Sequence, residues 1–254
     1  MNSTIIAVFT APELGFKGNP AAVVFSSSAL KDQVMQAEAA KIGMPATSFV
    51  FQDNAGDYQV RWFAPDEEID LCGHGAAAAG IFLANKAKEQ EIKLYHNGGS
   101  IVVKHEGDQF SMRLKAIPTL ERVQPPAAIL KGLGLPILEM YRTANKHLIV
   151  TDSEEALAAM KPDYAQLRQS EIFGYAVTAK GDQVDFVSRT LVPHVQQLED
   201  QATGSSHALL VPYWSARLNK TNLLAHQLSP RGGRFFAEIN GDEVVLSGTF
   251  EIEK

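Results

Sequence analysis

The sequence predicts an α+β protein built from two similar domains, and three observations support this fold class. Short runs rich in Val, Ile and Phe, bounded by Gly, Asn and Asp, recur along the chain and are typical of strands. Segments with helical spacing or small apolar residues interrupt these runs. Two related motifs also recur about half a chain length apart. At 254 residues, the chain is long enough for two modest domains with buried cores.

The first half contains strand-like runs around two helices. Residues 29–43 are expected to form an amphipathic helix, because Leu30, Val34 and Ile42 recur at helical spacing. The apolar run over residues 75–87 predicts a second helix. Strands are expected where the apolar alternation is clearest, at residues 4–9, 22–25, 48–51, 58–63, 92–95, 100–104 and 109–114.

The second half begins after a break in this pattern. Residues 116–134 contain Pro118, Pro125 and Pro126, which predict a linker. We therefore expect an N-terminal domain at residues 1–118 and a C-terminal domain at residues 119–254, whose last strand is a candidate to return to the first domain. Beyond the break, strands are expected at residues 148–151, 173–178, 184–188, 235–239 and 244–246, and helices at residues 153–160 and 206–218.

The internal repeat joins a strand end to a helix start. In the first copy RWFAP (residues 61–65) leads through DLCGHG (residues 70–75) into an apolar helix, and in the second RTLVP (residues 189–193) leads through DQATGSS (residues 200–206). Helix N-termini carry unpaired backbone N–H groups and a partial positive charge, so they bind anions. Two such termini facing one cleft suit a substrate carboxylate. The alternative interpretation is an ordinary N-cap at each helix.

The side chains at these helix starts are the candidate site. Asp200 is the candidate general acid/base, and His74 is the matching imidazole in the first copy. Asp70 reads as a loop or capping carboxylate. Cys72 is either a small buried hydrophobe or a thiolate stabilised by the helix start. Because the repeat places Thr203 opposite Cys72, a symmetric racemase with two thiols is excluded.

Composition narrows the range of partners. The net charge of −6 at pH 7 argues against nucleic acid and anionic membranes. Cys72 is the only cysteine, so intramolecular disulfides and cysteine-rich zinc sites are excluded, and the histidines lack metal-ligand spacing. No glycine motif of a nucleotide cofactor occurs. The first residues lack the basic region of a signal peptide, and the longest apolar stretch is too short to span a membrane, so we expect a cytoplasmic protein.

Several short segments, taken in order, resemble one known family. They are FKGNPAAVV (residues 16–24), RWFAP (61–65), EIDLCGH (68–74), EDQATGS (199–205) and QLSPRGG (227–233). Together they resemble the PhzF-like phenazine-biosynthesis isomerases, which share the diaminopimelate epimerase-like fold, over nearly the whole chain. The resemblance implies two pseudo-symmetric domains, each a curled, mostly antiparallel sheet around a central helix. It also implies a homodimer and acid/base chemistry, without metal or cofactor, on a small carboxylate-bearing substrate between the domains.

The resemblance assigns roles to single residues. Asp200 and His74 are implied as catalytic. The implied substrate-binding residues are Asn19, Gly73, Gly204 and Ser205. The proton-transferring glutamate of the family stands in a segment that here reads PATSF (residues 45–49), so Ala46 replaces it. We therefore expect a PhzF-like isomerase whose activity is impaired or altered. The alternative is a catalytically silent small-molecule-binding protein of the same fold.

Overall fold

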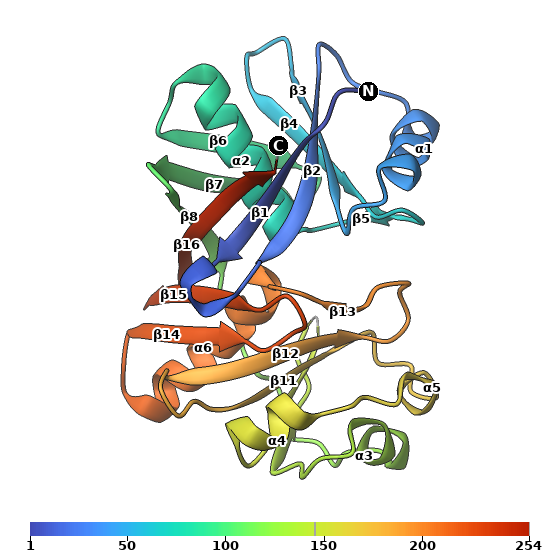
Figure 1. The fold of residues 1–254 in the computed structure, drawn as a ribbon, viewed down its shortest axis with the longest axis vertical. Helices are drawn as coiled ribbons and strands as arrows, with labels where there is room; N and C mark the ends of the chain where they lie inside the picture. The colour runs from blue at the N-terminus through green and yellow to red at the C-terminus, as the bar shows by residue number, and fades with distance from the viewer. Residues whose placement is uncertain (145, 254) are drawn as a thin grey trace. The chain divides into compact units, whose positions relative to one another are not determined.

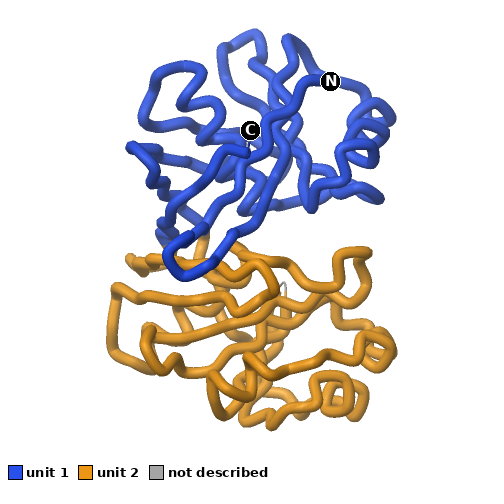
Figure 2. The backbone as a smooth tube through the Cα atoms, in the orientation of Figure 1, with its two compact units in different colours: residues 1–114, 245–254 blue, residues 115–244 orange. Residues whose placement is uncertain are grey.

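A computed structural model describes residues 1–144 and 146–253. The chain divides into two compact units, of which unit 1 comprises residues 1–114 and 245–254 and unit 2 comprises residues 115–244 (Figure 2). Each unit contains one long, largely buried helix and a curled sheet. Among the described residues, no helix is both long and apolar enough to cross a membrane.

Unit 1 is a closed barrel around helix α2 (Gly73–Ala87) (Figure 1). Its strands run in the order β1-β2-β3-β4-β6-β7-β8, and β16 pairs with both β8 and β1, which closes the ring. A short β5 (Glu68–Ile69) pairs with β4. The barrel strands are β1 (Thr4–Thr10), β2 (Asn19–Ser26), β3 (Thr47–Gln52), β4 (Tyr58–Phe63), β6 (Glu91–His96), β7 (Gly99–Glu106), β8 (Gln109–Lys115) and β16 (Glu243–Glu253).

Helix α2 is apolar on every side, as expected for a helix enclosed by a barrel. It packs closely against β7 because Gly80 has no side chain, and a Cβ at this position would lie 2.4 Å from Val103 Cβ. Helix α1 (Asp32–Ile42) instead has one buried face. Its Met35 and Ala39 pack against apolar residues of β2, β3 and β4, which explains its amphipathic pattern. A short 3-10 helix, η1 (Pro12–Leu14), joins β1 and β2.

Unit 2 has a similar sheet, in the order β15-β14-β12-β11-β10-β9, with the short β13 paired to β12. Its central helix is α6 (Gly204–Leu218), and the small helices α3 (Ala127–Leu133), α4 (Glu154–Ala159) and α5 (Tyr164–Leu167) pack on a second core. The strands are β9 (Glu139–Tyr141), β10 (His147–Val150), β11 (Tyr175–Lys180), β12 (Phe186–Val192), β13 (Leu198–Asp200), β14 (Asn222–Gln227) and β15 (Gly233–Asn240).

The strand pairings of the two units correspond. In unit 1, β2–β3 and β4–β6 are parallel, and in unit 2 the corresponding pairs β10–β11 and β12–β14 are parallel. The register also agrees, because Arg61 lies opposite Phe49 on β3 and Arg189 lies opposite Val177 on β11. The sequence repeat is therefore a repeat of structure. Its register aligns Asp200 with Ile69, one residue away from the alignment with Asp70 that the motifs suggested.

One expectation about the elements was wrong, and one gave a strand that was too short. Residues 127–133 within the expected linker form α3, because Pro126 at the N-cap and Gly134 at a left-handed C-cap bound one short helix. The last strand, expected at residues 244–246, extends over Glu243–Glu253. Its second half is held by antiparallel pairing with β1, a contact that local sequence does not report.

Candidate functional site

The start of α2 carries the candidate residues Gly73 and His74 of unit 1. Cys72 is the N-cap residue, and its Sγ accepts a hydrogen bond from the Gly75 N–H at 3.4 Å. Gly73 is the first helical residue, and His74, which is 7% exposed, is the second. The imidazole lies beside the thiol, with Nδ1 3.6 Å and Nε2 3.7 Å from Cys72 Sγ. The thiol therefore both caps the helix and contacts the candidate catalytic imidazole.

Close packing holds this helix start in place. A Cβ at Gly75 would lie 2.7 Å from Trp62 Cδ1 and 3.1 Å from Ser48 Oγ, so only glycine fits without displacement. The Ser48 hydroxyl donates to the Gly75 carbonyl at 2.9 Å. Ser48 of β3 and Trp62 of β4 lie opposite each other in the sheet, so this strand pair fixes the first turn of α2.

Ala46, which the resemblance places at the position of the family's glutamate, lies directly before β3. It is fully buried, and its carbonyl accepts a hydrogen bond from the Ala22 N–H of β2 at 2.9 Å. Asn19, the first residue of β2, is also fully buried. A methyl group transfers no proton, so position 46 supplies no acid or base to unit 1.

The start of α6 carries the candidate residues Gly204 and Ser205 of unit 2. Thr203 is the N-cap residue, but its side chain makes no capping hydrogen bond, and its hydroxyl instead donates to the Asp200 carbonyl at 3.3 Å. The hydroxyl of Ser205 accepts a hydrogen bond from Lys146 Nζ at 3.0 Å. A lysine that is 6% exposed therefore reaches the first turn of α6.

The loop that carries Asp200 is held from both ends by one amide side chain. Gln227, fully buried at the end of β14, accepts from the Thr203 N–H at 2.8 Å and donates to the Asp200 carbonyl. Ser229 donates to the Gln201 carbonyl between them. The motif QLSPRGG therefore positions the backbone of the Asp200 loop, a role that its sequence did not reveal.

The neighbouring carboxylate, Glu199, is engaged in a buried ion pair. Arg189 Nε and Nη2 lie 2.8 Å and 2.7 Å from its two oxygens, and Arg189 Nη1 donates to the Met160 carbonyl at 2.6 Å. In unit 1, Arg61 makes the corresponding pair with Glu68, but both partners there are partly exposed. Both oxygens of the Glu199 carboxylate are therefore engaged by the Arg189 guanidinium.

His207, one turn into α6, packs in the core of unit 2. Its ring is fully buried and stacks on Phe235 with 3.5 Å between centroids. Burial lowers the pKa of His207 to about 4, so this imidazole is neutral near pH 7. Among the described residues, no three His, Cys, Asp or Glu side chains are grouped as metal ligands.

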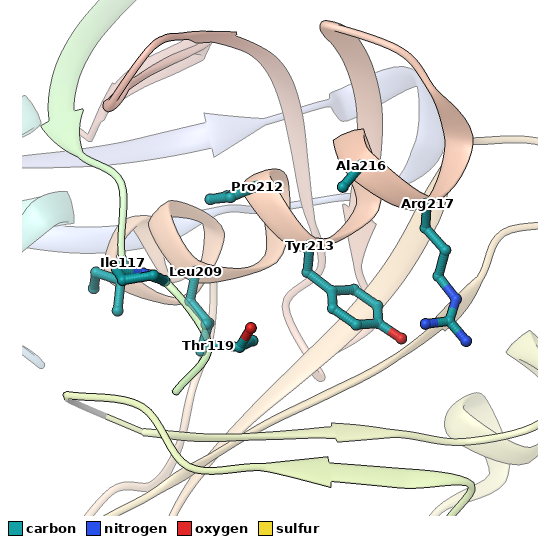
Figure 3. Close-up of a pocket in the computed structure, with 8 residues that line it drawn as sticks. Ile117, Thr119, Leu209, Pro212, Tyr213, Ala216 and Arg217 are labelled. Carbon is teal, nitrogen blue, oxygen red and sulfur yellow. The ribbon is translucent and has the colours of Figure 1, made fainter. Parts of the chain in front are cut away.

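A cavity of about 420 Å³ in unit 2 lies away from these residues (Figure 3). It forms between the segment 117–119 and the middle and end of α6, and Tyr213 and Arg217 line one side (Figure 3). Pro212 has no N–H, so the Ala208 carbonyl lacks its usual helical donor, and the Ile117 N–H donates to it instead at 2.9 Å. None of the residues predicted as site residues lines this cavity.

Lys146 was missed by the sequence interpretation. Lys146 directly precedes the short strand β10, and no periodic pattern or motif surrounds it. The local sequence therefore gave no indication of its position in the folded chain. Only the fold brings it to Ser205, on an element 59 residues further along the chain.

The chain is similar to a protein-family model, to curated proteins and to solved structures. Residues 6–249 match the family model described as phenazine biosynthesis-like protein. An uncharacterized isomerase of Pseudomonas aeruginosa is 38% identical over 98% of this chain and 95% of its own length. A crystal structure of a PhzF-family phenazine biosynthesis protein from Enterococcus faecalis has a TM-score of 0.89 and 34% identity, covering 100% of this chain and 98% of that one. A probable proline racemase from Agrobacterium radiobacter shares the fold, with a TM-score of 0.65 at 8% identity, covering 99% and 92% of the two chains.

Proposed function

The chain belongs to the phenazine biosynthesis-like (PhzC-PhzF) family, and we propose that it is an isomerase that moves a proton within a small carboxylate-bearing substrate, without a cofactor. The relatives named as isomerases support the reaction class. The observation that carries the assignment of the base is the loop of Asp200, which Gln227 holds at the start of α6, beside Ser205.

We assign Asp200 as the general acid/base that takes a proton from a substrate carbon and returns it at another position. A positioned group of this kind contributes about 10²–10⁴-fold to a rate. His74 assists by holding or donating a proton. Gly73, Gly204 and Ser205 supply donors at two helix starts, where an anion is stabilised, and Asn19 supplies a further amide.

Ala46 changes what this chemistry can achieve. A proton shift between two carbons proceeds best when one carboxylate removes the proton and another group delivers it. With Asp200 as the only carboxylate, a substrate proton exchanges with water, or it moves between two carbon atoms that both lie on the substrate face next to Asp200. We therefore propose low activity in the allylic proton shift of the family. The same alanine favours the second candidate, a catalytically silent binding protein.

Solvent deuterium exchange separates the two candidates. A dihydro-hydroxyanthranilate-like acid is incubated with the protein in D₂O, and carbon-bound deuterium is followed by mass spectrometry. An isomerase incorporates deuterium, and Asp200→Asn abolishes the incorporation because an amide cannot act as the base. Saturable binding without any incorporation by the unaltered protein contradicts the proposal and establishes the silent binder.

Restoring the carboxylate tests the role of Ala46. We expect Ala46→Glu to raise turnover of the same acid by about 10²-fold or more over Ala46→Gln, which has the same shape and cannot transfer a proton. Position 46 is fully buried, so ligand affinity and the thermal midpoint of each variant are measured as controls for folding. Equal turnover by the unaltered protein and Ala46→Glu contradicts the argument from the missing glutamate.

We also propose that the protein is a cytoplasmic homodimer. Light scattering on the purified protein tests the assembly, and a mass of one chain at micromolar concentration contradicts it.

A further inference from the structure

We propose that the cavity beside α6 binds a small uncharged molecule that has an apolar body and a carbonyl oxygen at one end. The cavity has a volume of about 420 Å³, within the range of about 300–1,000 Å³ that is typical of small-molecule sites. It is formed within unit 2 by the segment 117–119 and by α6, and none of the residues assigned to isomerisation lines it. The inference therefore concerns a second binding site and goes beyond the proposed function.

The apolar end of the cavity is built by the fold itself. Leu209 of α6 is 1% exposed, and Pro212 lies on the same side of the helix, almost one turn further along. Because proline has no N–H, the Ala208 carbonyl accepts from the Ile117 N–H at 2.9 Å, which ties the opposite wall to the helix. Figure 3 shows Ile117, Leu209 and Pro212 together at one end of the cavity. An apolar body bound there removes apolar surface from water.

The cavity lies where the two units differ. In unit 1, Phe25 near the end of β2 packs against Phe82 of α2, with 6.5 Å between the ring centroids. The parallel pairings of β2 with β3 and of β10 with β11 make Val150 the counterpart of Phe25. The equal lengths of α2 and α6 make Tyr213 the counterpart of Phe82, and Tyr213 lines the cavity. A smaller side chain thus stands in unit 2 where a phenylalanine covers the central helix of unit 1.

The other end of the cavity is polar, because Tyr213 and Arg217 lie there (Figure 3). The Arg217 guanidinium stands over the Tyr213 ring, 5.1 Å from its centre. Arg217 donates two of its five N–H hydrogens to Glu139, and the other three have no hydrogen-bond partner among the residues that the structure describes. A carbonyl oxygen of a ligand in the cavity can therefore accept a hydrogen bond from Arg217.

The charge of Arg217 is already neutralised, and this determines the class of ligand. The Glu139 side chain is 14% exposed, and its carboxylate also accepts from the Tyr141 hydroxyl at 2.9 Å and the Tyr213 hydroxyl at 3.0 Å. Burial opposes its ionisation, but the hydrogen bonds from Arg217 and the two tyrosines outweigh burial and lower the pKa of Glu139. The Glu139–Arg217 pair is therefore neutral near pH 7, and Glu139 would repel a second carboxylate on Arg217. An amide or a ketone offers the same acceptor atom without the charge.

Matched probes test the inference. They are 4-(trifluoromethyl)benzamide and 4-(trifluoromethyl)benzoate, which share one apolar ring and differ in the charge of the head group. Fluorine NMR titrations of the full-length protein at neutral pH measure the affinity for each probe. The amide has about 13 non-hydrogen atoms, so we expect a dissociation constant of about 1 mM for it. The acid is expected to bind about 10-fold more weakly.

Two variants, each with a control, locate the probe. Ala216→Trp fills the cavity from its exposed edge and is expected to abolish the saturable signal of the amide, whereas Ala158→Trp, at an exposed position of α4, leaves it unchanged. Glu139→Gln frees the charge of Arg217 and is expected to tighten binding of the acid by about 10-fold, the lower bound for a hydrogen bond to a charged group, with the amide affinity within about threefold. Glu155→Gln, on an exposed residue of α4, makes the same change in net charge and alters neither affinity.

Tighter binding of the acid than of the amide by the unaltered protein overturns the inference. Undiminished binding of the amide to Ala216→Trp places the probe elsewhere and also overturns it. So does the lack of saturable binding, which is the outcome when a second copy of the chain covers the cavity. Thermal midpoints are measured for every variant, and if Glu139→Gln proves unstable, the preference of the unaltered protein and the Ala216→Trp result still decide. The proposed function is decided separately, because deuterium exchange reads Asp200 chemistry and not occupancy of this cavity.

Discussion

Acidification is expected to destabilise unit 2 through His207. The imidazole is fully buried between Phe235 and Phe186, and its Nδ1 lies 2.9 Å from the Thr203 carbonyl, which accepts its hydrogen bond in the neutral form. Its Nε2 has no hydrogen-bond partner among the described residues. A second proton on the ring would therefore have no acceptor at Nε2, and the charge would lose its hydration, so desolvation by burial lowers the pKa of His207 to about 4.

The magnitude follows from the difference between folded and unfolded states. The unfolded imidazole has a pKa of about 6.5, so above this pH neither state binds the proton and His207 adds no pH dependence. Below pH 6.5 the unfolded state binds a proton that the folded state does not bind, so the free energy of unfolding falls as the pH is lowered. The loss is about 2 kcal/mol at pH 5 and approaches about 3 kcal/mol once the pH lies below the folded value near 4.

The assay uses the fact that the chain has two tryptophans. In a Trp62→Phe background, fluorescence of Trp214 reports on unit 2, where its ring stacks with Phe186. Urea unfolding is measured at pH 7.5 and pH 5 for this protein and for the same protein with His207→Asn, which keeps an N–H donor but does not titrate. We expect the loss on acidification to be about 2 kcal/mol smaller in the asparagine variant. Parallel losses in the two proteins would refute the reasoning.

Two further predictions use the repeat. Arg189→Met is expected to lower the free energy of unfolding by about 3–5 kcal/mol because it leaves Glu199 buried without a counter-charge, whereas Arg61→Met, at the partly exposed counterpart, costs about 1 kcal/mol or less by the same urea assay. Equal costs would show that burial does not decide the strength of the pair. Cys72→Ser is expected to leave ligand affinity and turnover within a few-fold, because a serine hydroxyl also caps a helix. A loss near 10³-fold with an unchanged thermal midpoint would make the thiol catalytic.

Much of the architecture was predictable because it follows local periodicity. Residues 58–63 were expected as a strand and form β4 with the same bounds, since Val60 and Trp62, two residues apart, are both buried. The apolar run at residues 75–87 was expected as a helix and forms most of α2. The strands β5 and β9 were missed because two or three residues are too few to show a period, and pairing with neighbours alone makes them strands.

The candidate site was predictable where a motif carries it and invisible elsewhere. Asp200, Gly204 and Ser205 stand together in the sequence, at one helix start, so the repeat and the resemblance name them as candidates. The function of Gln227 depends on two hydrogen bonds to a loop 24 and 27 residues away, which no spacing reports. The position of Lys146 depends on the parallel pairing of β10 with β11, which brings this residue beside Gly174. Contacts of this kind are properties of the folded chain.

The pairing of β16 with β1 and β8 has a consequence for the order of events during synthesis. The barrel of unit 1 closes only when residues 245–253 are available, although its other strands are complete by residue 115. At about 5–20 residues per second, a ribosome needs roughly 7–26 seconds to make the 130 residues of the intervening unit 2. Throughout that interval the nascent unit 1 exposes the edges of both β1 and β8, which are templates for pairing with other chains. A chain truncated after Val244 is therefore expected to aggregate even though every residue of unit 2 is present.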